Sequence, residues 1–336
     1  MKLYFYFFVS FVCCACAHKE IMPVILDSFP ETVELSDGTV LIEDYLFEPY
    51  RIQVSDSLLF AYSSSCGDDQ ILVTVLPTLK DIPFLKIGRG PGEATHVNGL
   101  QILGDSLFVS IDPKMIYSYS ISNILDGKFQ SNAAYHDING FFVGTELVFC
   151  EERNLKDQKN STMYQLRDLQ GETLFLGDFV ESDTEFPDYD YTKQTAYQGK
   201  IYVSPDCSKA IFVYLYAIGY DIIDIPSLTV EHHVWKAPQV TVRYISELDA
   251  NIVKGSPERE TGFSEGCATE NNIYLKYISD NQTYILKYDW KGKESTLYKV
   301  NLEITRFFVD EQEASIYALV PEDDRLSLIR YNLREL

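Results

Sequence analysis

Asp105-Ser106-Leu107-Phe108 is one occurrence of a short phrase that returns six times along this chain. The phrase consists of a turn residue, a small or polar residue, Leu or Ile, and then an aromatic or aliphatic residue. It occurs at residues 56–59, 105–108, 145–148, 199–202, 271–274 and 314–317. The 258 residues from Leu58 to Ile316 cover five intervals of about 52 residues each, and repeats of roughly 40–50 residues built from several strands are typical of β-propellers.

A second strand is expected after each phrase. The apolar segments that fill this role are residues 71–79, 116–121, 163–169, 220–225, 284–290 and 326–333. Turn residues such as Asp112-Pro113 and Asp280-Asn281 stand between the paired segments. Six hairpins in succession predict an all-β fold, a six-bladed β-propeller of four-stranded antiparallel blades, and not alternating strands and helices.

The last blade of this predicted ring is one strand short, because the chain ends soon after residues 326–333. Residues 33–42 look like a first strand with a turn at Asp37-Gly38. We expect this N-terminal segment to supply the missing strand and close the ring, since open strand edges promote aggregation. The single propeller domain is therefore predicted over residues 33–336.

The N-terminus has the features of a secretory signal. Lys2 precedes an apolar run over residues 3–12, and Ala15 precedes Cys16. We expect residues 1–15 to be a signal peptide, Cys16 to carry the lipid of a bacterial lipoprotein, and residues 16–32 to be a lipidated N-terminus and tether. The alternative is ordinary signal-peptide cleavage, which would release a soluble exported protein.

The composition is acidic and aromatic. The chain has 28 Lys and Arg against 50 Asp and Glu, a net charge of −22, and 14% aromatic residues. Nucleic acid is excluded as a partner, because binding it depends on basic side chains that neutralise phosphates. The charge predicts a soluble surface, and the alternative is a surface that attracts cations or basic partners.

The cysteines and acidic residues do not predict a metal site. Four cysteines lie beyond the N-terminal segment, at Cys66, Cys150, Cys207 and Cys267, without the spacing of metal ligands. Buried thiols are the preferred interpretation, and their disulfide state stays open because export permits disulfides. No cofactor is expected; Ca²⁺ in the central channel is an alternative that the spacing of the acidic residues does not support.

One glycine-rich loop stands out between the first two repeats. It reads Gly88-Arg89-Gly90-Pro91-Gly92-Glu93, and its alternating glycines with a proline predict a tight, rigid turn. Glu93 stands where a dinucleotide fingerprint needs its third glycine, and no Gly-Lys-Ser/Thr follows as in a P-loop.

This loop, the lipoprotein-like N-terminus and the repeated strand pairs together resemble the six-bladed β-propeller lipoproteins of Bacteroides-type bacteria, which are often described as TolB-like. The resemblance covers about residues 33–336. It implies the propeller fold and an exported, cell-envelope location, and it implies no particular activity or catalytic residue.

The candidate ligand-binding residues form two groups. Arg89, Gly90, Glu93 and His96 could lie at the mouth of the central channel and donate to a carboxylate or a sugar; alternatively, Arg89 and Glu93 only pin the loop that joins two blades. The second group is Asp188, Tyr189 and Tyr191, in an acidic and aromatic stretch over residues 181–198 that suits carbohydrate binding, with an exposed acidic loop as the alternative.

The connection over residues 235–266 is also long. Within it, residues 245–254 are expected to form a short helix that ends at Gly255. Of the five histidines, His232 and His233 are adjacent in a strand-like run, so their side chains should face opposite ways.

No catalytic constellation is found, and no Gly-x-Ser-x-Gly elbow is present. We therefore expect a non-enzymatic binding or scaffold module for a protein, peptide or glycan. We expect a monomer that is exported to the cell envelope. It would be an outer-membrane lipoprotein that faces the periplasm or the cell surface, and only its lipid would contact the membrane. The alternative is a metal-assisted hydrolase, lactonase-like or lyase-like propeller. Three or more convergent carboxylate or amide oxygens would favour the enzyme, and an aromatic channel without convergent charge would favour binding.

Overall fold

A computed structural model describes most of the chain after residue 19. The described residues are 20–45, 48–55, 57–63, 68–76, 78–90, 93–111, 115–136, 141–142, 147–150, 164–168, 172–178, 180, 196–238, 240–245, 250–255, 260–279, 282–312, 314–322 and 325–334. The predicted signal peptide and Cys16 lie outside these ranges. None of the helices within them has the length and apolarity needed to cross a membrane.

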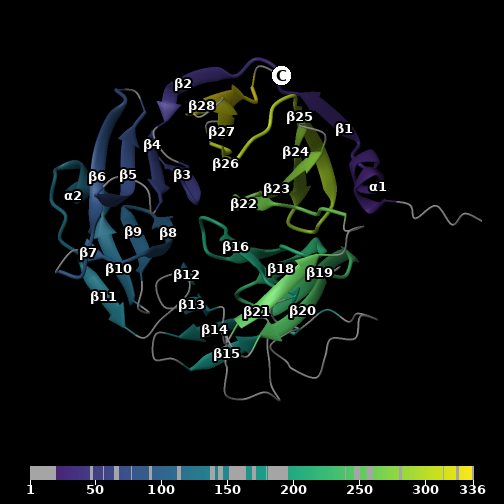
Figure 1. Ribbon diagram of the computed structural model, residues 1–336, viewed down its shortest axis with the longest axis horizontal. Coiled ribbons are helices and arrows are strands. Elements are labelled where there is room, and N and C mark those ends of the chain that lie inside the picture. The colour runs from purple at the N-terminus through teal and green to yellow at the C-terminus, as the bar shows by residue number, and fades with distance from the viewer. Residues whose placement is uncertain are drawn as a thin grey trace, which may run out of the picture.

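Six sheets of four or five strands stand around a common centre in the described part of the chain (Figure 1). The first three blades are β3–β7 (Arg51–Ser55, Leu58–Tyr62, Asp69–Val75, Lys80–Ile87, Glu93–Ala94), β8–β11 (Val97–Leu103, Ser106–Ile111, Met115–Ser120, Ala133–His136) and β12–β15 (Phe141–Phe142, Leu147–Cys150, Gln165–Asp168, Thr173–Leu176). The other three are β16–β19 (Gly199–Val203, Lys209–Tyr214, Ile218–Asp224, Thr229–Lys236), β22–β25 (Glu265–Ala268, Asn272–Ser279, Gln282–Asp289, Glu294–Val300), and β26–β28 with β2 (Arg306–Asp310, Ser315–Glu322, Arg325–Asn332, Thr39–Tyr45).

Each blade is an antiparallel meander that starts at its innermost strand (Figure 1). The second strand of a blade is covered on both faces by neighbouring blades, and Leu59, Phe60 and Ala61 of β4 are accordingly 0% exposed. This double burial explains the recurrent apolar phrase, which falls on the second strand in five blades. In the fourth blade it falls on the innermost strand β16, and β17 is the second strand.

The N-terminal segment closes the ring, as expected from the sequence. β2 pairs antiparallel with β28 and becomes the outer strand of the sixth blade. The single strand predicted over residues 33–42 is in fact two. β1 (Glu31–Glu34) pairs parallel with β25 on the outer edge of the fifth blade, and the chain then crosses to β2. One short segment therefore covers two open edges.

The tether predicted for residues 16–32 is partly folded. Ile21–Asp27 form the helix α1, in which Met22 and Ile25 are buried. Met22, Ile25 and Phe29 belong to a core cluster with side chains of the fourth and fifth blades. The carboxylate of Glu260 accepts a hydrogen bond from the backbone N–H of Met22 in the first turn of the helix, which satisfies a donor that a helix leaves open. The helix is thus part of the propeller body.

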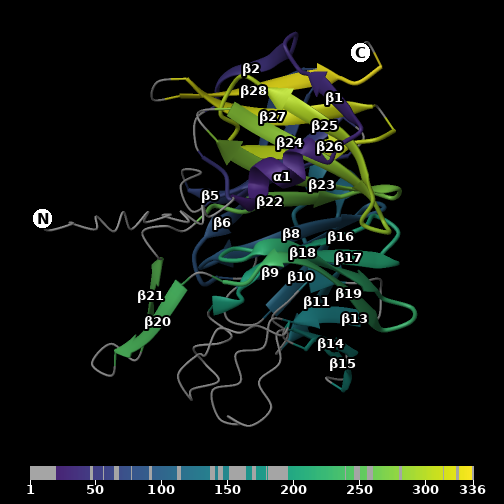
Figure 2. The same cartoon turned by 90° about the vertical axis from the view of Figure 1, so that its right-hand side faces the viewer.

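The helix predicted over residues 245–254 is wrong. β20 (Val240–Ile245) and β21 (Ala250–Gly255) form an antiparallel hairpin instead, and Figure 2 shows it apart from the blades. The run Val240-Thr241-Val242 is rich in β-branched residues, which favour strands over helices. The second helix, α2 (Ile121–Leu125), follows β10 and is capped by the hydroxyl of Ser120.

Substitution of Gly38 should weaken the closure of the ring. A Cβ at this position would lie 2.3 Å from Ile329 and 2.8 Å from Tyr331, both side chains of β28. Gly38→Val should therefore lower the free energy of unfolding by about 1–3 kcal/mol, as overpacking does. The exposed neighbour Asp37 provides the control, since Asp37→Ala should change it by less than about 0.5 kcal/mol. Urea denaturation measures both, and equal effects would contradict the contact.

Candidate functional site

The centre of the ring is a narrow channel with a cavity volume of about 40 Å³, partly open to solvent. It is lined by β3, β8, β16, β22 and β26, the innermost strands of five blades. Charged residues, Arg51 and Glu265, and amide residues, Gln53 and Gln101, are among those that line it. Phe307 also borders it, but its ring packs in the core between the fifth and sixth blades.

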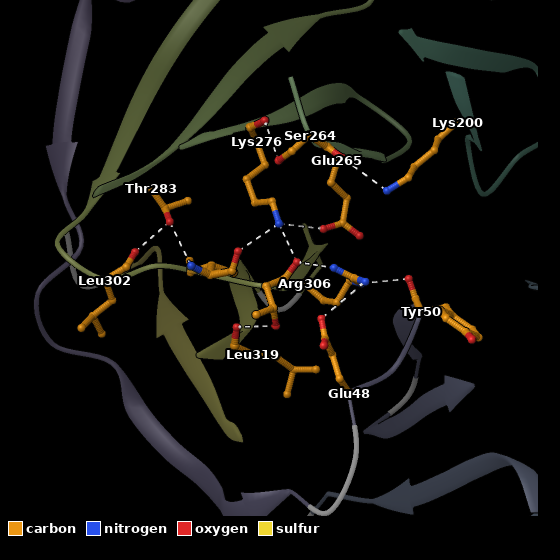
Figure 3. A network of polar contacts seen from close by, with 12 residues as sticks. Glu48, Tyr50, Lys200, Ser264, Glu265, Lys276, Thr283, Leu302, Arg306 and Leu319 are labelled. Atoms are coloured by element: carbon orange, nitrogen blue, oxygen red, sulfur yellow. Dashed lines mark hydrogen bonds and ion pairs between the residues drawn. The ribbon is translucent and has the colours of Figure 1, made fainter. Parts of the chain in front are cut away.

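Charged residues cluster at one mouth of this channel for a topological reason. Arg51, Glu265 and Arg306 are the first residues of β3, β22 and β26, and Lys200 is the second residue of β16. The innermost strands of a meander propeller all run the same way along the axis, so their first residues lie at the same end. Figure 3 shows Lys200, Glu265 and Arg306 converging there.

Glu265 and Lys276 form a buried ion pair. They are direct cross-strand neighbours on β22 and β23, their charged atoms are 3.1 Å apart, and the two side chains are about 5% and 4% exposed. Lys276 Nζ also donates to the carbonyl oxygens of Ile304 (2.9 Å) and Thr305 (2.6 Å). Burial lowers the pKa of Lys276, and the Glu265 carboxylate opposes this. Oε2 of Glu265 accepts no hydrogen bond from the described residues, so the pair rests on charge attraction. The bonds from Lys276 fix the connection between the fifth and sixth blades (Figure 3).

Arg306 is held mainly by backbone oxygens. Its guanidinium donates to the carbonyl of Tyr50 at 2.9 Å and to the carbonyl of Thr305 at 2.8 Å. Its ion pair with Glu48 is long, at 3.7 Å, and the Glu48 side chain is 61% exposed. Glu48 therefore neutralises little of the charge of Arg306.

Arg51 reaches from the first blade to the fourth. Its guanidinium donates to the carbonyl oxygen of Ile201 at 3.2 Å and lies 4.3 Å from the centre of the Tyr202 ring. Both of these residues belong to β16. A basic side chain thus spans the channel near its mouth.

Lys200 is the most accessible base of the group. Its side chain is open to solvent, and Nζ donates to the carbonyl oxygen of Ser264 at 3.3 Å. The surrounding protein lowers the pKa of Lys200 by desolvation; the charge of Glu265 raises it, and those of Arg306, Lys276 and Arg51 lower it. In the described ranges Lys200 makes no ion pair.

Two amides lie in the channel without partners. Oε1 of Gln53 and Oε1 of Gln101 are buried and accept no hydrogen bond from the described residues. Gln101 as a whole is only 9% exposed. Cys267, which also lines the channel, is a buried thiol as predicted, and burial raises its pKa to about 12.

The glycine-rich loop lies at the outer edge of the first blade. β7 pairs with β6, the outermost strand of the meander. The Glu93 carboxylate accepts from the backbone N–H of Gly90 at 2.7 Å, and a Cβ on Gly88 would come within 1.9 Å of that carboxylate. Glu93 pins the loop, while Arg89 is exposed.

His96 contacts a residue next to the channel mouth. Its ring meets Tyr50 edge-on at 6.2 Å, and the Tyr50 carbonyl accepts from Arg306. Asp188, Tyr189 and Tyr191 lie outside the described residues.

The four charged residues at the mouth of the channel were missed in the sequence analysis. Each of them is a single residue in a different repeat, so no motif marks the group: Arg51, Lys200, Glu265 and Arg306.

A second polar cluster joins the third and fourth blades. The carboxylate of Asp221, which is 0% exposed, accepts from the hydroxyls of Tyr214 (2.7 Å) and Tyr164 (3.3 Å) and lies 2.9 Å from Nδ1 of His232. The hydrogen bond to Asp221 raises the pKa of His232. His233 faces the other way, stacked 5.0 Å from Tyr220, so the two histidines take opposite faces as predicted.

A metal site is not formed by the described residues: no three His, Cys, Asp or Glu side chains among them are placed to hold an ion. Of the described residues that line the channel, Glu265 is the one carboxylate, and it forms an ion pair with Lys276. The charge that converges at the mouth is therefore basic, an arrangement that neither sequence-based hypothesis anticipated.

Comparisons with known proteins agree with this architecture. Residues 27–312 match the model of a family described as TolB-like 6-blade propeller-like. A Bacteroides fragilis protein described as exported is similar with a TM-score of 0.53 and 12% identity, over 88% of this chain and 93% of that chain. Regucalcin, a calcium-binding protein from Agrobacterium tumefaciens, has a TM-score of 0.45 and 10% identity, over 90% and 95%. These identities show likeness of fold alone. No curated protein matches the chain.

The roles of Glu93 and Arg89 in the loop can be separated. Glu93→Ala removes a charge-assisted hydrogen bond to a backbone N–H and should lower the free energy of unfolding by about 1–2 kcal/mol. Arg89→Ala, at an exposed position, should change it by less than about 0.5 kcal/mol. Urea denaturation measures both, and an equal loss for Arg89→Ala would show that both residues pin the loop.

Protonation of His232 should couple stability to pH. Below about pH 6.5 the imidazole is protonated in the folded and unfolded states, and its bond to Asp221 contributes in full. As the pH rises through the raised folded-state pKa, the imidazolium loses its proton and this contribution is lost. The free energy of unfolding should therefore fall above about pH 6.5. His232→Gln should reduce that slope in denaturant titrations from pH 5.5 to 8.5; an unchanged slope would exclude His232 as its source.

Proposed function

Because the chain belongs to the TolB-like 6-blade propeller family, we propose that it is an exported cell-envelope propeller that binds a ligand at the mouth of its central channel. Its N-terminal sequence supports export, with an apolar run over residues 3–12 and Cys16 after a small residue. A structural relative described as exported is consistent with the same location. The proposed form is a monomeric lipoprotein, anchored through Cys16 to the outer membrane.

The convergence of charged side chains from four blades at one mouth is the observation that carries the binding role. Pockets that bind ligands combine apolar walls with a few placed polar groups. Apolar residues are among those that line the channel, charged groups lie at its opening, and two amides have no partners among the described residues. The ligand class of this proposal is a protein, peptide or glycan of the envelope.

The alternative, a metal-assisted hydrolase, lactonase-like or lyase-like enzyme, needs oxygen ligands for a hard cation. The described channel offers one carboxylate, and this group already pairs with Lys276. No specific observation favours the enzyme.

Anchoring is tested by changing Cys16. In a Gram-negative host the unaltered protein should fractionate with membranes and incorporate labelled palmitate, and Cys16→Ser should abolish the label and release the protein into the soluble fraction. Cys14→Ser is the matched control and should keep the label. Export without label in the unaltered protein would show ordinary signal-peptide cleavage.

Binding is tested by hydrogen exchange. The purified protein is mixed with glycans and peptides released from the host envelope, and amide protection is mapped along the chain. Protection should appear at the starts of β3, β16, β22 and β26. Protection confined to other segments would overturn the channel as the binding face.

A further inference from the structure

Among the described residues at the mouth of the channel, the basic side chains Arg51, Lys200, Lys276 and Arg306 outnumber the acidic side chains Glu48 and Glu265. Glu265 neutralises Lys276. Lys200 and Arg306 donate mainly to backbone carbonyl oxygens, which orient these two side chains without cancelling their charge. This is a basic centre in a chain whose net charge is −22.

Unpartnered amides lie beside this charge. Gln53 is two residues after Arg51 on β3, so the two side chains share a face of the strand. Gln101 is nine-tenths buried, lines the same channel and has an orphaned Oε1. Buried polar groups without partners cost stability, and they persist in native proteins where a ligand or water completes them. An amide both donates and accepts, and its terminal torsion turns easily.

The requirements of these groups define one kind of ligand. Guanidinium and ammonium groups select a carboxylate. The amides select neighbouring groups that both donate and accept, as sugar hydroxyls do.

We propose that the channel mouth binds a sugar acid of the uronic type, with its carboxylate held by Lys200 and Arg306 and its hydroxyls held by Gln53 and Gln101. This inference rests on the proposed binding role of the channel and names its ligand class. The residues differ from the glycine-rich loop that the sequence suggests.

The bonds to carbonyl oxygens also link blades, so a purely structural role must be separated from binding. Lys200 suits this test because it is solvent-exposed and makes a single long hydrogen bond, at 3.3 Å. Lys200→Met removes its charge and Lys200→Arg keeps it. Lys86→Met is the matched control, since Lys86 is exposed on β6, the outermost strand of the first blade's meander.

The experiment is calorimetric titration of the purified full-length protein with glucuronate, glucose, acetate and N-acetyl-dialanine. Glucuronate should bind most tightly. Lys200→Met should weaken its binding about tenfold, with an unchanged melting temperature, and Lys200→Arg and Lys86→Met should bind normally. Gln53→Leu should weaken glucuronate roughly three- to tenfold and leave acetate unaffected.

The other results are equally decisive. Equal affinity for glucose and glucuronate, or no effect of Lys200→Met, overturns the carboxylate site while the channel remains a binding face. Preference for N-acetyl-dialanine overturns the sugar acid in favour of a peptide terminus. If none of the four compounds binds, the sugar-acid proposal fails, and the hydrogen-exchange experiment on the envelope mixture decides separately whether the channel binds at all.

Discussion

The pairing of β2 with β28 is the interaction on which the rest of the molecule depends. Blades share their cores with neighbours, so a ring with one blade a strand short would leave both an unpaired edge and an incompletely covered face. Antiparallel pairing over Thr39–Tyr45 removes that edge. The segment before β2 adds two further contacts. β1 covers the outer edge of β25, and α1 packs into the core between the fourth and fifth blades.

A closed ring determines where the charged residues meet. Once each blade starts at its innermost strand, the first residues of those strands form a circle around one opening, whatever their separation in sequence. Arg51 and Ile201 are 150 positions apart and are joined by a hydrogen bond; Arg306 and Tyr50 are 256 apart and are joined as well. The site is thus a product of closure, since no single blade contains it.

The fold could be read from the sequence because its signal is repeated. The second strand of a blade is buried on both faces, so the same apolar phrase recurs and its period identifies a propeller. In the fourth blade the phrase marks the innermost strand β16 and not the second strand β17. The two strands are hard to tell apart in the sequence, because both follow turn residues and both contain apolar runs. The N-terminal helix was missed because seven residues give too short a pattern, and its stability comes from packing by Met22 and Ile25.

The site could not be read in the same way, because its members are unrepeated single residues. A usable signal does exist once the blades are in register. Arg51 lies seven residues before Leu58, and Arg306 lies ten residues before Ile316. In these two blades a charged residue seven to ten positions before the Leu or Ile of the buried phrase begins the innermost strand. The glycine-rich loop gave a clearer sequence pattern than these single charged residues. Its glycines are explained by packing, because the Glu93 side chain approaches Gly88 and Gly90 closely.

The contrast between an acidic chain and a basic channel mouth has an electrostatic consequence. At physiological ionic strength the Debye length is about 8 Å, so acidic groups on the outer surface are screened from the channel. At the mouth, the protein on either side lowers the effective dielectric constant near the basic groups, so their fields are screened less than those of outer-surface charges. Desolvation and the neighbouring cations lower the pKa of Lys200, while the charge of Glu265 opposes this. An entering carboxylate would relieve the repulsion among these cations, so the free protein holds them in an arrangement that favours an anion.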